Sequence, residues 1–197
     1  LALLAPALTE PGAVLVDATV GLGGHSRMAL DRFPAIRVIG IDRDPEALEI
    51  AAERLSASRE RVHLVHAVFD EIPSVLADQG IACADGVLFD LGVSSMQLDE
   101  ARRGFSYAQD SELDMRMNPG DVLTAADVVN DYAEEDLIRI LRQFGEEKFA
   151  PRIARGIVRA REGHRVCRSS ELASIVKEAI PAAARRRGGN PAKRTFQ

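Results

Sequence analysis

Short apolar runs alternate with amphipathic segments over the first 91 residues of the chain. Four runs have the length and composition of buried strands: residues 13–17, 37–41, 62–66 and 85–91. The segments after the first three carry apolar residues at helical spacing: 25–31, 45–56 and 71–79. This β–α alternation predicts an α/β fold with a doubly wound parallel sheet, whose ligands bind at the carboxyl ends of the strands.

The pattern changes after residue 91. Residues 92–122 are rich in Gly, Ser, Asp, Met and Arg without a clear period, which favours a binding loop over a plain connection. From Thr124 onward the apolar spacing is helical again. We therefore predict an inserted helical domain at 99–185, with 1–98 and 186–197 forming the α/β core.

The composition is that of an ordinary globular protein, with 46% hydrophobic and 28% charged residues. No apolar run approaches the roughly 20 residues that span a bilayer. Cys83 and Cys167 are the only cysteines, so neither a disulfide framework nor a cysteine-rich metal site is expected. These features predict a cytoplasmic protein without a bound metal or a membrane partner.

Charge is unevenly distributed along the chain. The net charge is −5, yet residues 151–197 contain 12 Lys or Arg against 3 acids. Such asymmetry indicates a polyanionic partner for the basic part, although solvated helix faces rich in Arg would produce some of it.

A glycine turn follows the first predicted strand in the stretch VLVDATVGLGGH, with Gly21, Gly23 and Gly24. Glycines let the backbone approach a ligand closely, and the helix that follows offers free N–H groups. Asp42 ends the second strand about 20 residues later, where nucleotide folds place a carboxylate on ribose hydroxyls. The alternative is a helix-capping role, because Asp42 lies just before Pro45.

Two nucleotide cofactors fit this pattern to different degrees. A dinucleotide fingerprint has a third glycine where this chain has Ser26, and Asp17 just before the loop would repel a pyrophosphate. Asp17 would suit the ammonium or sulfonium of S-adenosylmethionine. Phe69 follows the third strand and would pack on an adenine ring or simply in the core. Asp90 ends the fourth strand, where it would face the reactive end of the cofactor.

Several longer strings resemble one family along nearly the whole chain. They are DATVGLGGHS, GIDRDPEAL, DGVLFDLGVSSMQLD, RGFSY, LDMRM, GEEKFAPRIARGIV and PAKRTFQ. In this order they are similar to the bacterial N4-cytosine methyltransferases of 16S ribosomal RNA (RsmH or MraW type). The resemblance implies a class I S-adenosylmethionine-dependent methyltransferase fold with an inserted helical domain for RNA recognition. It also implies methylation of the N4 amine of a cytidine in the decoding region of the small ribosomal subunit.

The resemblance assigns roles to individual positions. Gly23, Gly24 and His25 would hold the methionine end of the cofactor, and Asp42 the ribose hydroxyls. Phe69 would contact the adenine, while Asp90 and Gln97 complete the cofactor pocket. Asp90 is also the candidate catalytic residue, as an acceptor for the amine hydrogens, although a role in cofactor contact alone stays open.

The resemblance further implies an RNA-facing surface on the helical insertion and the basic tail. Phe105 and Tyr107 are candidates for stacking on a base. The candidates for phosphate contact are Arg102, Arg103, Arg116, Arg152, Arg155 and Arg185–Arg187.

Compared with that family, the chain is expected to be truncated at both ends and to lack the C-terminal strands of the core. Two other functions stay open: an NAD(P)-linked oxidoreductase, and a non-catalytic RNA-binding assembly factor on the same fold. A homodimer is compatible with the sequence, which does not determine the oligomeric state.

Overall fold

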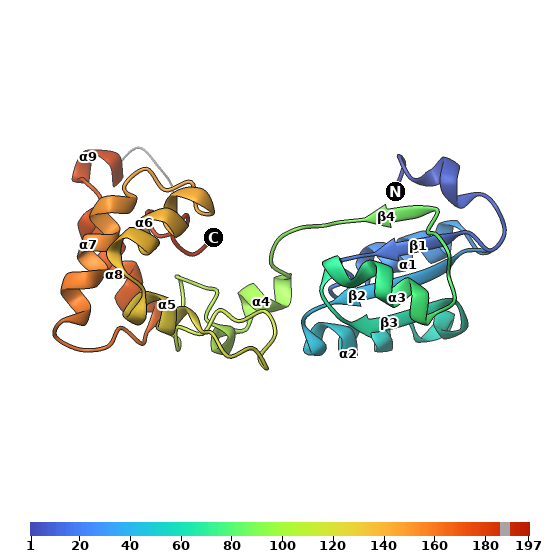
Figure 1. Cartoon of the computed structure of the whole chain (residues 1–197), viewed down its shortest axis with the longest axis horizontal. Coiled ribbons are helices and arrows are strands. Elements are labelled where there is room, and N and C mark those ends of the chain that lie inside the picture. Colours follow the sequence, from blue (N-terminus) through green and yellow to red (C-terminus); the bar gives the residue numbers. More distant parts are fainter. Residues whose placement is uncertain (186–189) are drawn as a thin grey trace. The chain divides into compact units, whose positions relative to one another are not determined.

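The computed structural model describes residues 1–185 and 190–197 (Figure 1). The chain forms two compact units, Leu1–Ser94 and Ser95–Gln197. The first contains all the strands found in the described residues, and the second is helical. Within the same residues, no helix combines the length and apolar character needed to cross a bilayer.

The first unit is built on a four-stranded parallel sheet with the strand order β3-β2-β1-β4. Its strands are β1 (Val14–Asp17), β2 (Arg37–Asp42), β3 (Val62–His66) and β4 (Gly86–Leu88). Asp17 pairs with Gly40 of β2 and with Leu88 of β4, so the ends of these strands lie at one edge of the sheet. This order and direction confirm the predicted doubly wound sheet.

Helices cover both faces of the sheet, because its inner strands are apolar on both sides. The α-helices of this unit are α1 (Gly24–Arg32), α2 (Pro45–Arg54) and α3 (Ile72–Asp78). Its 3₁₀ helices are η1 (Ala5–Leu8), η2 (Ser56–Arg61) and η3 (Phe69–Glu71). Leu15 and Val38 pack with Leu30 of α1 on one face. Val16 and Ile39 pack with Val75 of α3 on the other.

Strand β4 is shorter than the apolar run 85–91 predicts. It ends at Leu88, because its partner on β1 is Asp17, the last residue of that strand. Beyond it, Phe89 is 48% exposed and Leu91 is 69% exposed. The run is apolar as expected, but its second half leaves the sheet.

The second unit consists of helices around a separate core. The elements are α4 (Ser95–Asp99), η4 (Ala101–Arg103), α5 (Ala125–Asp131), α6 (Glu134–Gln143), α7 (Ala150–Arg161), α8 (Ser169–Ala179) and α9 (Ala182–Arg185). Thr124 begins α5 with a capping box, in which its hydroxyl accepts from the Asp127 N–H and the Asp127 carboxylate accepts from the Thr124 N–H. Leu137, Ile153 and Val176 bury the apolar faces of α6, α7 and α8 against one another.

The boundaries of the helical unit differ from the predicted 99–185. Short helices α4 and η4 lie in the stretch expected to be without regular structure, and the unit begins at Ser95. At the other end, Ala192 and Phe196 are buried in the helical core. The Phe196 ring lies 5.9 Å from that of Tyr107, edge to face. Residues 190–197 therefore pack with the helices and not with the sheet, because their apolar side chains complete the helical core.

Candidate cofactor and active site

The glycine turn after β1 shapes the start of α1. Gly21 (φ 50°) and Gly23 (φ 78°) have left-handed backbones, which favour glycine. Gly23 is the N-cap of α1, and a Cβ on it would lie 3.2 Å from Leu55. A Cβ on Gly24 would meet no atom within 4 Å. The turn is thus tightly packed at Gly23 and open at Gly24, the position where a ligand would approach the helix.

The Asp42 carboxylate joins the end of β2 to the glycine turn. One of its oxygens, Oδ2, accepts from the Gly21 N–H at 2.7 Å, and Oδ1 accepts from the Asp44 N–H at 2.9 Å. Each carboxylate oxygen keeps a second lone pair for another donor. The side chain is therefore held in place and can still accept hydrogen bonds from a ligand.

Helix capping belongs to Asp44 and not to Asp42. Asp44 is the N-cap residue of α2, and its Oδ1 accepts from the Glu46 N–H at 3.1 Å. Pro45 at the first helical position lacks an N–H to satisfy. The capping alternative for Asp42 thus loses its main support, and the Asp42 carboxylate bonds to the glycine turn.

Asp90 lies at the same edge of the sheet, beyond β4. Its backbone N–H donates to Thr19 Oγ1 at 2.8 Å, which ties the segment after β4 to the segment after β1. Its carboxylate Oδ2 lies 3.6 Å from His25 Nδ1 on α1. The Asp90 side chain is 68% exposed and that of His25 is 43% exposed, so a ligand can reach both.

Two exposed aromatic rings pack on each other, and one of them directly precedes Asp90 in the chain. Phe69 begins η3 after β3, and Phe89 directly precedes Asp90. The ring centroids are 5.9 Å apart in an edge-to-face arrangement. About half of each side chain is exposed. An exposed aromatic pair at the edge of a sheet offers an apolar surface to a flat ring.

Asp17 lies buried beneath the glycine turn. Ser26 Oγ donates to its Oδ2 at 2.7 Å, while Oδ1 is buried with no hydrogen-bond partner among the described residues. Burial raises the pKa of the Asp17 carboxyl, more than the hydrogen bond from Ser26 lowers it. A positive charge above the turn would favour the ionised carboxylate, whereas a phosphate would disfavour it.

The structure brings six of the seven predicted site residues to this edge of the first unit: Gly23, Gly24, His25, Asp42, Phe69 and Asp90. The seventh, Gln97, belongs to α4 of the second unit, where its side chain is buried. Among residues 1–185 and 190–197, no three His, Cys, Asp or Glu side chains form a group that could hold a metal ion.

Sequence reasoning missed Thr19 and Phe89. Thr19 lies inside the stretch DATVGLGGH, but only the structure shows that its hydroxyl accepts from Asp90. Phe89 reads as one more apolar residue of a buried strand, and its exposure follows from the early end of β4. An aromatic residue next to a strand-end acid was the available signal.

The predicted RNA-facing residues are two aromatic residues and a set of arginines. Phe105 is buried, and Tyr107 packs on Phe196, so packing does not support their proposed stacking on a base. Arg102 pairs with Glu100 at 2.6 Å. Arg185 ends α9, and Arg186 and Arg187 lie outside the described residues.

Comparisons of the sequence with a family model and with known proteins indicate the same family. A sequence model of the MraW methylase family matches residues 2–197. Proteins named ribosomal RNA small subunit methyltransferase H are 60% identical in Beutenbergia cavernae and 56% identical in Streptomyces avermitilis. Each alignment covers 99% of this chain, with 59% and 61% of the relative respectively.

A third relative of the same name, from Mycolicibacterium smegmatis, is 58% identical over 99% of this chain and 54% of its own length. The chain thus spans less than two thirds of the length of these relatives. A solved structure of a candidate rRNA-methylase from Clostridium thermocellum is 27% identical, with a TM-score of 0.34. The match covers 43% of this chain and 45% of that one. The family match over nearly all residues shows that this chain belongs to the MraW methylase family.

Proposed function

We propose that this protein transfers a methyl group from S-adenosylmethionine to the N4 amine of a cytidine in the decoding region of 16S rRNA. The observation that carries the proposal is the arrangement at the carboxyl edge of the sheet. There an open glycine turn, the anchored Asp42 carboxylate and the exposed Asp90 carboxylate occur together in a chain of the MraW methylase family.

Several features of the first unit support this cofactor. The space at Gly24 admits its amino-acid end to the start of α1, and the buried Asp17 favours its positive charges over a pyrophosphate. The second lone pairs of Asp42 would accept from the ribose hydroxyls. Phe69 and Phe89 would contact the adenine face. An NAD(P) cofactor fits less well, because it would bring phosphate charge next to Asp17.

The cofactor supplies a methyl group on a sulfonium, and the protein orients the amine that receives it. The cytidine amine is a weak nucleophile because its lone pair is delocalised into the ring. Asp90 would accept a hydrogen bond from an amine hydrogen and hold the nitrogen in line with the methyl group. An amine that accepts the methyl group would lose one proton, and the Asp90 carboxylate would accept this proton or pass it to water. His25, 3.6 Å from Asp90, would orient this carboxylate.

The relatives support an RNA substrate, because their names describe a methyltransferase of small-subunit ribosomal RNA. An RNA substrate also agrees with the basic character of residues 151–197. Ribosomal subunits are cytoplasmic in bacteria, which would place the protein there.

Two measurements test the proposal. Calorimetric titration should show saturable binding of S-adenosylmethionine but not of NAD. With unmethylated small subunits and labelled cofactor, nucleoside analysis should then find label in N4-methylcytidine.

Asp90→Asn should lower the rate of methyl transfer with little change in cofactor affinity. Asp78 is an exposed acid at the end of α3, and Asp78→Asn should behave as wild type. Binding of NAD alone, or label on another atom, would refute the proposal.

A further inference from the structure

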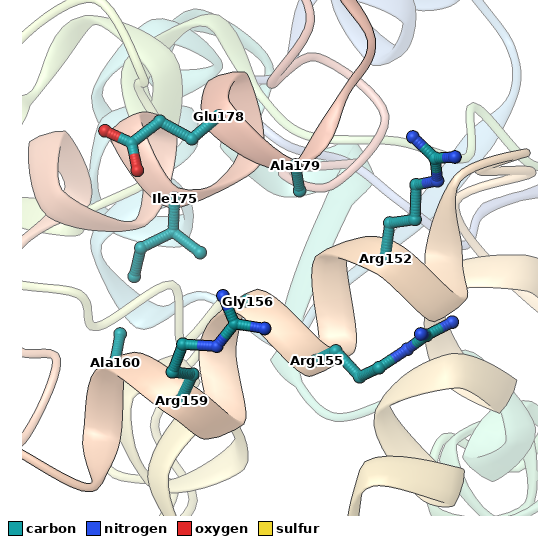
Figure 2. Close-up of a pocket in the computed structure, with 8 residues that line it drawn as sticks. All are labelled: Arg152, Arg155, Gly156, Arg159, Ala160, Ile175, Glu178 and Ala179. Carbon is teal, nitrogen blue, oxygen red and sulfur yellow. The ribbon is translucent and has the colours of Figure 1, made fainter.

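An open groove of about 480 Å³ lies between α7 and α8 of the helical unit (Figure 2). Three arginines of α7 line it: Arg152, Arg155 and Arg159. The volume is within the range of sites that hold one small molecule, roughly 300–1,000 Å³. The groove belongs to the second unit alone and uses none of the residues assigned to the cofactor.

Close packing of the two helices forms the base of the groove. A Cβ on Gly156 of α7 would lie 3.2 Å from Ile175 Cγ2 and 3.8 Å from Ala179 Cβ, both on α8. Glycine at this position lets α8 approach the α7 backbone. Ile175 lines the groove and gives it an apolar wall beside the arginines.

The charges in the groove are strongly one-sided. Helix α7 carries four arginines and no acid. Arg152 and Arg159 are seven residues apart, which separates their Cα atoms by about 10.5 Å along the helix axis. Glu178 is the carboxylate of the lining, and in Figure 2 it points away from Arg159. The groove therefore presents a row of positive charge along one helix.

Most other arginines of this unit are already bonded within the fold. Arg103 donates to the backbone carbonyls of Arg116 and Met117. Arg161 donates to the Val129 carbonyl, and Arg168 forms an ion pair with Asp110. These guanidiniums hold loops and helices together.

The groove arginines differ from these. Within the described part of the chain, the side chains of Arg152 and Arg159 have no hydrogen bond or ion pair, and both are exposed. Arg155 is partly used, since its Nε donates to the Pro151 carbonyl and lies 3.8 Å from Glu134 Oε1. Arg152 and Arg159 are thus available to a ligand without breaking a contact of the fold.

We propose that the α7–α8 groove binds the phosphate backbone of single-stranded RNA, with Arg152 and Arg159 contacting separate phosphates. This inference rests on the proposed function, because it takes RNA as the polyanion. Repeated phosphates match a row of guanidiniums, and Ile175 would contact a sugar or base between them. The groove would hold the RNA in position and would take no part in the methyl transfer itself.

The test compares two doubly substituted chains with the wild-type chain. Arg152→Gln/Arg159→Gln removes two positive charges from the groove. Arg142→Gln/Lys148→Gln removes two exposed charges of the same unit outside it. The affinity of each for a single-stranded RNA from the decoding region is measured at several salt concentrations, with polyglutamate as a competitor.

For the groove variant, the slope of log affinity against log salt should fall by about 1.4, because each lost phosphate contact contributes about 0.7. Its RNA affinity should then drop about 25-fold at about 0.1 M salt. The control variant should change the slope much less, and both variants should bind S-adenosylmethionine as wild type does.

Other results would overturn the inference in distinguishable ways. An unchanged slope in the groove variant, or equal effects of the two double substitutions, would remove the groove as the contact surface. Displacement of polyglutamate from the groove without any effect on RNA would point to an acidic protein instead. If the wild-type chain binds RNA through the groove but transfers no methyl group to it, the groove assignment stands and the proposed activity fails.

Discussion

Substitution of Gly24 by alanine separates the fold of the glycine turn from its role in binding. The position is the first residue of α1, and its added Cβ would meet no atom within 4 Å. Alanine is a better helix former than glycine, by up to about 1 kcal/mol in a helix interior. We therefore expect Gly24→Ala to leave the free energy of unfolding unchanged or raise it by up to about 1 kcal/mol.

The same methyl group would occupy the open space at the helix start, where the proposed cofactor would bind. If the amino-acid end of S-adenosylmethionine lies there, Gly24→Ala should weaken its binding at least about tenfold, or about 1.4 kcal/mol. Calorimetry measures the affinity, and urea denaturation measures the stability of the same preparation. A chain that is as stable as wild type but binds poorly would assign the loss to the ligand contact.

Gly23→Ala, unlike Gly24→Ala, should destabilise the fold itself. Gly23 has φ 78°, and its Cβ would lie 3.2 Å from Leu55. We expect a stability loss of about 1–2 kcal/mol from the left-handed backbone alone.

If Gly24→Ala binds S-adenosylmethionine as tightly as wild type does, the reasoning that places the cofactor at this turn is refuted.

Three further predictions concern single side chains. Asp42→Ala should weaken S-adenosylmethionine binding by roughly 1.5–3 kcal/mol, the range for a hydrogen bond to a charged group, and unchanged calorimetric affinity would remove Asp42 from the ribose role. Gly104→Ala should lower the free energy of unfolding, measured by urea denaturation, by about 2–4 kcal/mol, because its Cβ would lie 2.6 Å from the Glu112 carbonyl oxygen. A loss below about 1 kcal/mol would contradict this contact. The hydrogen bonds and ion pair from Arg168, together with hydrogen bonding from Ser170, lower the pKa of Asp110 from 3.8 to about 2, so their contribution to stability is present above 3.8 and is lost as the pH falls toward 2. In a carboxyl NMR titration, Arg168→Gln should move the Asp110 midpoint up toward 3.8, and an unmoved midpoint would exclude Arg168 as the cause.

The sheet and the placement of most candidate site residues at its edge could be predicted because both depend on local pattern. Alternating apolar runs and amphipathic helices determine a parallel sheet, and parallel strands end at one edge. Residues at or just beyond the strand ends, such as Asp42 and Asp90, are then placed at the same edge of the sheet. The predicted and observed bounds of β3 are identical, Val62–His66, and the 3₁₀ helix η2 ends directly before this strand.

Features that depend on a distant partner could not be predicted in the same way. The end of β4 is determined by the last residue of β1, and the exposure of Phe89 follows from it. The packing of Phe196 on Tyr107 depends on a contact between residues 89 positions apart. Hydrophobic periodicity carries no information on which apolar residue meets which.

For the arginines of the helical unit, too, the sequence does not show which side chains are bonded within the fold. Counting charges along the sequence gives Arg116 and Arg152 equal weight as phosphate contacts. In the structure Arg116 forms an ion pair with Asp114 at 2.6 Å and also donates to the Asp121 carbonyl, so binding a phosphate would compete with contacts that hold a loop. Arg152 and Arg159 form no such contact among the described residues, so a phosphate there would compete with none of the contacts described for this unit. If the helical unit binds RNA as proposed, its contact surface is better inferred from arginines without partners among the described residues than from the regions where arginines are most frequent.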